Sequence, residues 1–178
     1  LLTGGEPLVR RGIMTLIQNL GRHIPTGDLE ELTLTTNGSQ LSNFATQLAD
    51  HGVRRINVSL DTLDADNFKE LTRRGDFDQV IKGLDAARDA GLQIKINMVA
   101  LKGFNDHEFS NMVRWCGDQG FDLTMIETMP MGEMDFHRGD QYMPLSEVRT
   151  RIAEDFTLTD NPYRTGGPAR YVTVEETG

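Results

Sequence analysis

The stretch that decides the fold spans residues 93–100 and reads Gln-Ile-Lys-Ile-Asn-Met-Val-Ala. Polar and apolar side chains alternate along it, and a period of two is typical of a strand with one buried face. Short β-rich runs also occupy residues 32–36, 55–60 and 123–128. We therefore predict four strands, each of which leads into a turn.

Apolar residues between these strands recur with the spacing of amphipathic helices. The spacing predicts helices over residues 13–21, 41–52, 77–91 and about 105–120, and a fifth after Pro144. Strands that alternate with helices indicate an α/β fold with a parallel sheet, and we predict an incomplete (β/α) barrel. After Gly132 the sequence becomes polar and irregular, so we predict a core over 1–132 and a C-terminal extension over 133–178. A strand is expected there over 169–175.

Composition excludes several classes of protein. The 178 residues are 38% apolar and 25% charged, which suits one domain with a sizeable core. A net charge of −9 disfavours a nucleic-acid-binding surface. The sequence has no apolar run of membrane-spanning length and no secretory leader, so we expect a soluble cytoplasmic protein. It begins at Leu1 rather than at methionine, in what reads as the end of a strand, and we expect a piece of a longer protein.

Polar side chains fall on one phase of three predicted strands. They are Thr33, Thr35, Asn57, Ser59, Asp61, Gln93, Lys95 and Asn97. Successive side chains point to opposite faces of a sheet, so the apolar phase can pack on helices while the polar phase faces a shared interior. Ordinary barrel interiors are filled by aliphatic residues. We therefore predict a wet channel for a polar, nucleotide-sized ligand. The alternative is an exposed sheet face or an internal hydrogen-bond network.

Short motifs close the predicted strands. They are Gly-Gly-Glu-Pro at 4–7, Thr-Thr-Asn-Gly at 35–38, Asn-Val-Ser-Leu-Asp at 57–61, Lys-Ile-Asn at 95–97 and Ile-Glu-Thr-Met-Pro-Met-Gly at 126–132. Glycines allow a ligand to approach the backbone closely. The first motif alone is better explained as a tight turn between a strand and a helix, and only its context with the other motifs favours a ligand site.

This ordered set, with Gly-Gly-Pro-Ala-Arg-Tyr at 166–171, resembles the radical S-adenosylmethionine (radical SAM) superfamily and, within it, the GTP 3′,8-cyclase family. The resemblance implies a partial (β/α)6 TIM-like barrel that lacks its first βα unit here, followed by the start of a C-terminal extension. It also implies a lyase of molybdenum cofactor biosynthesis. That enzyme uses S-adenosylmethionine and two [4Fe–4S] clusters to convert GTP to 3′,8-cyclo-7,8-dihydro-GTP.

The resemblance also implies ligand contacts, residue by residue. For S-adenosylmethionine these are Gly4, Gly5, Glu6, Ser59, Asn97 and Met129. Thr35 and Lys95 are expected to face GTP, with Lys95 supplying a cation for the phosphates. Thr124 stands where the family often has an arginine for the triphosphate, so the phosphate contacts here are expected to differ.

The cysteine content departs from the family pattern. Cys116 is the single cysteine, whereas a cluster takes about three or four thiolates, so we expect this chain to hold no cluster and to be inactive alone. Cys116 is expected to be a buried thiol on a helix. The resemblance further implies a homodimer and a downstream partner, cyclic pyranopterin monophosphate synthase. Another radical enzyme that modifies a peptide or cofactor, or a non-catalytic barrel-derived binding module, remains an alternative.

Overall fold

The structure is a computed structural model and describes residues 1–128, 141–164 and 168–177. The chain divides into two compact units. The first comprises Leu1–Met98 and Phe121–Thr124, and the second comprises Val99–Gly120 and Met125–Gly178. The boundary predicted at residues 132 and 133 lies outside the described residues and stays a prediction.

The described residues include one sheet of four strands. Its strands are β1 (Thr33–Thr36), β2 (Arg55–Ser59), β3 (Gln93–Ala100) and β4 (Asp122–Glu127), in the order β1-β2-β3-β4. The predicted alternation lies on three of them, β1 to β3. β1 pairs with β2 in parallel, and β2 pairs with β3 in parallel. Leu2 adds an isolated parallel bridge to Leu34 of β1. The α/β class and the parallel sheet are therefore confirmed, whereas closure into a partial barrel stays a prediction.

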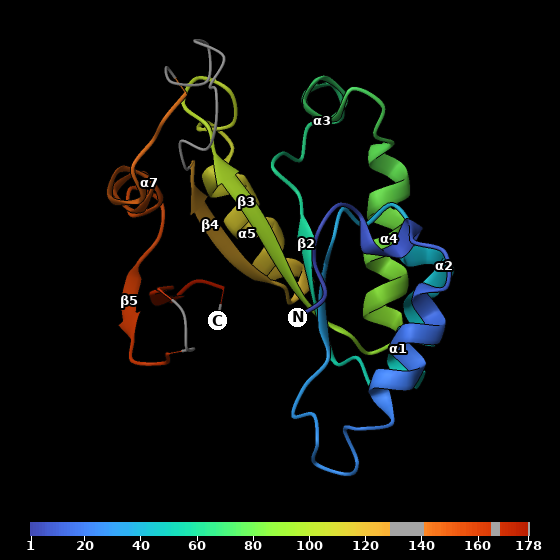
Figure 1. The fold of residues 1–178 in the computed structure, drawn as a ribbon. Helices are drawn as coiled ribbons and strands as arrows, with labels where there is room; N and C mark the ends of the chain where they lie inside the picture. The colour runs from blue at the N-terminus through green and yellow to red at the C-terminus, as the bar shows by residue number, and fades with distance from the viewer. Residues whose placement is uncertain (129–140, 165–167, 178) are drawn as a thin grey trace. The chain divides into compact units, whose positions relative to one another are not determined.

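Helices of the first unit gather on one side of β2 (Figure 1). The helical segments are η1 (Pro7–Val9), α1 (Ile13–Gly21), α2 (Leu41–Asp50), α3 (Ala65–Thr72) and α4 (Phe77–Asp89). α2 packs against both α1 and α4. Its approach to α4 depends on Gly83, because a Cβ placed there would lie 2.7 Å from the Gly38 carbonyl oxygen. The apolar phase of β1 to β3 is buried at Leu34, Ile56, Val58, Ile94, Ile96 and Met98.

Two helices differ from the sequence prediction. The apolar periodicity did not predict α3, because this helix buries only Phe68 and so lacks a clear apolar stripe, although a capping role between a strand and a helix was the expected role of Asp64. The helix begins where the Asp64 carboxylate accepts a hydrogen bond from the Asn67 N–H at 2.8 Å, which is an N-cap. The helix predicted from about Asn105 starts later, as α5 (Phe109–Gln119). The Asn105 amide accepts from the Leu101 N–H and donates to the Val99 carbonyl, which holds this segment as a turn.

The second unit contains α5, α7 (Leu145–Ile152) and an antiparallel pair, β5 (Leu158–Asn161) and β6 (Tyr171–Val174). α5 packs against α7. β6 and the helix after Pro144 were predicted, whereas β5 was not. Cys116 on α5 is 2% exposed, so the prediction of a buried thiol is confirmed.

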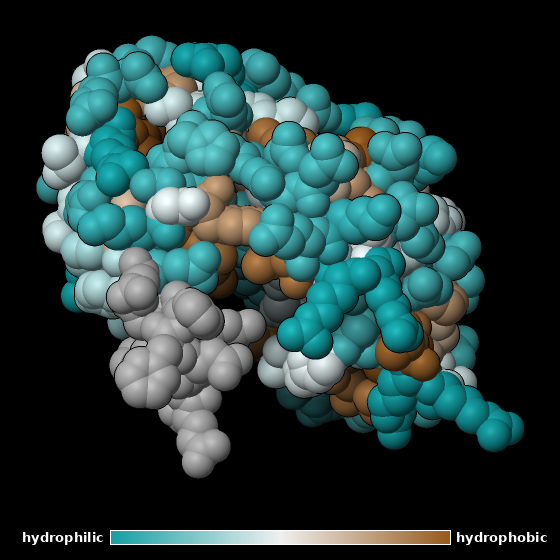
Figure 2. Space-filling view, turned by 90° about the horizontal axis from the view of Figure 1, so that it is seen from above, coloured by the Kyte–Doolittle hydropathy of each residue, from teal (hydrophilic) through white to brown (hydrophobic). Residues whose placement is uncertain are grey.

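Hydrophilic residues cover most of the described part of the face seen in Figure 2, with hydrophobic residues in small groups between them. Among the residues that the structure describes, no helix is both long and apolar enough to cross a bilayer.

Candidate functional site

Two rows of polar side chains lie on the face opposite the buried apolar phase, hereafter the polar face; one crosses β1, β2 and β3, and the other crosses β2 and β3. The parallel register pairs Thr35 with Asn57, and Asn57 with Lys95, which makes the first row. Ser59 pairs with Asn97 in the second row, two residues further along β2 and β3. The predicted GTP contacts Thr35 and Lys95 therefore share one row. The predicted S-adenosylmethionine contacts Ser59 and Asn97 share the next.

The side chains of both rows remain accessible. Thr35, Asn57, Lys95 and Asn97 are half-buried and Ser59 is exposed, while their neighbours along the strands are buried. The Asn57 Nδ2 group donates a long hydrogen bond of 3.4 Å to the Thr35 Oγ1 atom. Asn57 was not predicted as a contact residue, although the alternation placed it on the polar phase. Its position between Thr35 and Lys95 follows only from the register.

The glycine turn at Gly4 and Gly5 leaves open space around its backbone. Gly4 has φ of 131°, a conformation that residues with side chains rarely adopt. In the part of the chain that the structure describes, no atom outside the adjacent residues lies within 4 Å of a Cβ placed at either glycine. Just before the turn, the Leu2 N–H donates to the Thr33 carbonyl at 2.7 Å. The turn thus follows a segment that runs beside β1, and its backbone is accessible to a ligand.

The Glu6 carboxylate makes three hydrogen bonds within the chain. Its Oε1 atom accepts from the Thr36 hydroxyl at 2.7 Å and from the Leu8 N–H at 3.0 Å. Its Oε2 atom accepts from the Asn37 N–H at 2.6 Å. The contact of Glu6 with S-adenosylmethionine stays a prediction, and the structure adds a link to the end of β1.

A separate polar contact occurs in the second unit at Glu127. Its Oε1 atom accepts from the Tyr142 hydroxyl at 2.7 Å, and its Oε2 atom accepts from the Leu145 N–H at 3.0 Å. The Tyr142 bond, followed by the Leu145 bond, lowers the pKa of Glu127 below its ordinary value. The same carboxylate raises the pKa of Tyr142, chiefly through their hydrogen bond. Met129 lies outside the described residues.

A sequence profile of the radical SAM superfamily matches residues 1–116. This chain belongs to the radical SAM superfamily. The matched part includes the glycine turn, both rows of the polar face and α4. The superfamily resemblance predicted from the strand-end motifs is confirmed.

Curated relatives of this radical SAM chain carry a more specific name. A protein of Brucella canis named GTP 3′,8-cyclase is 64% identical over 177 residues, which cover 99% of this chain and 52% of that protein. A protein of Brucella ovis with the same name is 63% identical with the same coverage. The chain thus spans about half the length of the curated relatives it matches.

Among solved structures, a radical SAM methyltransferase from Sphaerobacter thermophilus aligns with a TM-score of 0.47 and 19% identity. The alignment covers 68% of this chain and 37% of that one.

The radical SAM family implies an iron–sulfur cluster, which the side chains of this chain do not fit. A cluster usually takes three or four thiolates, and Cys116 is the single cysteine. Among the described residues, no group of three or more His, Cys, Asp or Glu side chains could hold a metal ion. The polar face does fit a nucleoside or a nucleotide, because its hydroxyl, amide and ammonium groups can bind ribose, base and phosphate atoms.

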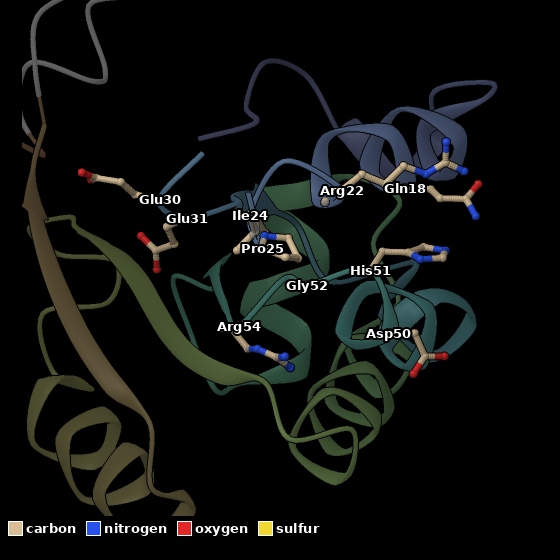
Figure 3. A pocket seen from close by; sticks show the side chains of 11 residues that line it. Gln18, Arg22, Ile24, Pro25, Glu30, Glu31, Asp50, His51, Gly52 and Arg54 are labelled. Carbon is tan, nitrogen blue, oxygen red and sulfur yellow. The ribbon is translucent and has the colours of Figure 1, made fainter. Parts of the chain in front are cut away.

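A pocket of about 410 Å³ lies elsewhere in the first unit of this radical SAM chain. It is lined from the ends of α1 and α2 and from the segments that follow them (Figure 3). Its charged side chains are of both signs, such as Arg22, Glu31 and Arg54. None of the described residues predicted to bind a ligand lines it. The polar face, where the predicted residues meet in register, is therefore the better candidate site.

Proposed function

We propose that this chain is the middle part of a GTP 3′,8-cyclase, a radical SAM lyase that converts GTP to 3′,8-cyclo-7,8-dihydro-GTP in molybdenum cofactor biosynthesis. The observation that carries the proposal is the parallel register of β1 to β3, which groups Thr35 with Lys95 and Ser59 with Asn97. The 64% identity to curated proteins of that name supports the same reaction.

In this proposal the first row binds GTP. Lys95 provides an ammonium group for a phosphate oxygen, and Thr35 provides a hydroxyl group. Neighbouring strands lie about 4.8 Å apart, so Thr35 and Lys95 stand roughly 10 Å apart with Asn57 between them. A ligand that touches both must cross β2. Thr124, in place of the family's arginine, leaves Lys95 as a principal cation for the phosphates on these strands.

The second row and the glycine turn bind S-adenosylmethionine in this proposal. Ser59 and Asn97 offer a hydroxyl and an amide, and Gly4 and Gly5 offer accessible backbone. The rows are two residues apart along the strands, roughly 6.6 Å, so the two ligands would lie side by side. When bound with its cluster, S-adenosylmethionine supplies the radical chemistry. The residues of this chain orient the two ligands and limit access of water.

The full-length protein is the product of the complete reading frame that contains this chain. Its cluster ligands would come from the part outside this chain. The partial (β/α)6 barrel with its C-terminal extension, the two clusters, the cytoplasmic homodimer and the downstream synthase belong to the same proposal. The described chain alone would then be inactive, since it has one buried cysteine.

The test is anaerobic reconstitution of the full-length protein with iron and sulfide, followed by addition of S-adenosylmethionine with and without GTP. We expect 5′-deoxyadenosine to form only when GTP is present, with ATP as the matched control nucleotide. Formation that is independent of GTP would instead indicate a radical enzyme that acts on a peptide or another cofactor. Failure to bind any cluster would indicate a non-catalytic binding module.

A further inference from the structure

Glu6 occupies an unusual position between two predicted ligand-binding segments. It directly follows the glycine turn predicted to bind S-adenosylmethionine, and its partners Thr36 and Asn37 directly follow Thr35, which is predicted to face GTP. One carboxylate therefore bridges the two segments, which lie about thirty residues apart in the sequence. The carboxylate can contact a ligand directly, or it can hold two segments of the protein together.

The hydrogen-bond capacity of the carboxylate favours the second role. An ionised carboxylate offers about four lone-pair sites, and Thr36, Asn37 and Leu8 fill three of them on Glu6. Hydrogen bonds to an ionised acceptor are shorter and stronger than neutral ones, in agreement with the distances of 2.6 and 2.7 Å to Asn37 and Thr36. At most one site remains for a ligand. Most of this carboxylate is committed to the link.

The partner side of the link is firmly held. Thr36 is 2% exposed, and its Oγ1 atom accepts from the Gly38 N–H at 3.1 Å, so its one hydroxyl proton is directed to Glu6. The Ser39 carbonyl accepts from the Gln79 side chain of α4 at 2.8 Å. Gly38 has φ of 80°, and a Cβ there would lie 3.0 Å from the Val80 side chain. The end of β1 is thus fixed against α4.

The described residues provide no such packing on the turn side of the link. None of their atoms, apart from those of the adjacent residues, lies within 4 Å of a Cβ placed at Gly4 or Gly5. Glycine backbone is also the most costly to order, because it has the most conformational freedom to lose. Leu2 holds the start of the turn beside β1, and a bond from Glu6 to a fixed segment is a means to hold its other end.

We propose that Glu6 is a positioning residue that ties the glycine turn to the end of β1 and thereby sets the binding surfaces for both ligands. This inference rests on the proposed function. It assigns Glu6 an action through Thr36 and Asn37, in contrast to direct recognition of S-adenosylmethionine by its carboxylate. A direct contact would affect that ligand alone, whereas loss of the tie affects both.

The test compares E6Q, T36V and the double variant of the full-length, cluster-loaded protein. Dissociation constants for S-adenosylmethionine and for GTP are measured separately by calorimetry. E6Q replaces the carboxylate oxygen that accepts from the Asn37 N–H with an NH2 group, which cannot accept a hydrogen bond. T36V removes the hydroxyl group at nearly constant shape. The matched control is D64N, which makes the same carboxylate-to-amide change at the N-cap of α3, where the carboxylate accepts from the Asn67 N–H.

We expect E6Q and T36V each to raise the dissociation constants for both ligands about tenfold, which is the effect of losing one charge-assisted hydrogen bond. The double variant should lie within about twofold of E6Q, because both substitutions break the same tie. T36S should restore binding, and D64N should leave both constants unchanged. The proposal is overturned if E6Q weakens S-adenosylmethionine alone while T36V weakens neither ligand, or if the two effects multiply in the double variant.

Folding and the proposed function are separated from this result. Thermal unfolding of each variant is recorded first. If E6Q does not fold, the proposal is tested by comparing T36V with T36S, and equal ligand affinities of these two variants would overturn the proposed tie. If the wild-type protein binds no GTP, the proposed function fails. The tie is then still scored on S-adenosylmethionine, by the non-additivity of E6Q and T36V.

Discussion

The two faces of β1 to β3 are built from alternate residues of the same strands and serve different ends. On one face Ile56, Val58 and Ile96 are completely buried. On the other, Asn57 and Lys95 stand beside them in sequence yet remain half-buried. Burial of the first set supplies free energy for folding, whereas the second set leaves polar groups available to a ligand. Substitutions one residue apart should therefore fail in different assays.

The largest expected effect is on the apolar face. Ile96→Ala removes a side chain with 0% exposure and should destabilise the full-length protein by about 2–5 kcal/mol, through lost burial and a residual cavity. Urea denaturation measures it. The control is Gln93→Ala, an exposed polar-phase position on the same strand, which should stay within about 0.5 kcal/mol of wild type. Equal losses would show that the two faces are not distinct.

A pair of glycines makes the same comparison with a single methyl group. Gly83→Ala places a Cβ 2.7 Å from the Gly38 carbonyl oxygen and should cost about 1–3 kcal/mol of stability, less the gain in helix propensity. The methyl group of Gly5→Ala meets no atom of the described residues within 4 Å, so stability should change little. This added methyl group should instead raise the dissociation constant for S-adenosylmethionine about tenfold. Denaturation measures the stability of both variants, and calorimetry measures their affinity for S-adenosylmethionine. A loss of stability in Gly5→Ala together with a loss of affinity in Gly83→Ala would contradict these expectations.

Asn57 tests the row that only the register reveals. Asn57→Ala removes an amide that lies between Thr35 and Lys95 and should weaken GTP about 2- to 10-fold, the range for one neutral hydrogen bond. S-adenosylmethionine binding should be unchanged. Calorimetric titration with each ligand measures both effects, and Gln93→Ala again serves as control. A loss confined to S-adenosylmethionine would place the two ligands in the wrong rows.

The smallest effect concerns a polar contact of the second unit. Tyr142→Phe should raise the pKa of Glu127 toward its ordinary value, because the Tyr142 hydrogen bond is the largest cause of its depression. A depressed carboxyl pKa stabilises the folded state above the unfolded pKa, and this contribution is lost as pH falls through the folded pKa. Titration of the Glu127 carboxyl by NMR measures the shift. An unchanged pKa would refute the assigned cause.

Much of the sheet was predictable from the sequence because alternation is a local signal. The pattern from Gln93 to Ala100 gave β3 and the phase of Lys95 and Asn97 without knowledge of any partner strand. Helices with a full apolar stripe, such as α4, could be predicted equally well from the sequence. Strand register is a long-range property, and for that reason the position of Asn57 between Thr35 and Lys95 was not predicted.

Side-chain hydrogen bonds explain the remaining differences. The Asn105 side chain bonds to Val99 and Leu101, so a turn replaces the first residues of the helix predicted there. Glu6 was predicted from a resemblance as a ligand contact, and its bond to Thr36 joins residues thirty positions apart. Periodicity carries no information on such contacts, since they depend on where two segments meet in space.

In the proposed function, the polar face of β1 to β3 binds GTP beside S-adenosylmethionine. Calorimetric titration of the full-length protein and its Lys95→Ala variant with each ligand tests this most directly. We predict that the substitution raises the dissociation constant for GTP at least about tenfold, through loss of a charged hydrogen bond, and that for S-adenosylmethionine less than about twofold. Equal losses of affinity for the two ligands, or no loss for GTP, would contradict the account.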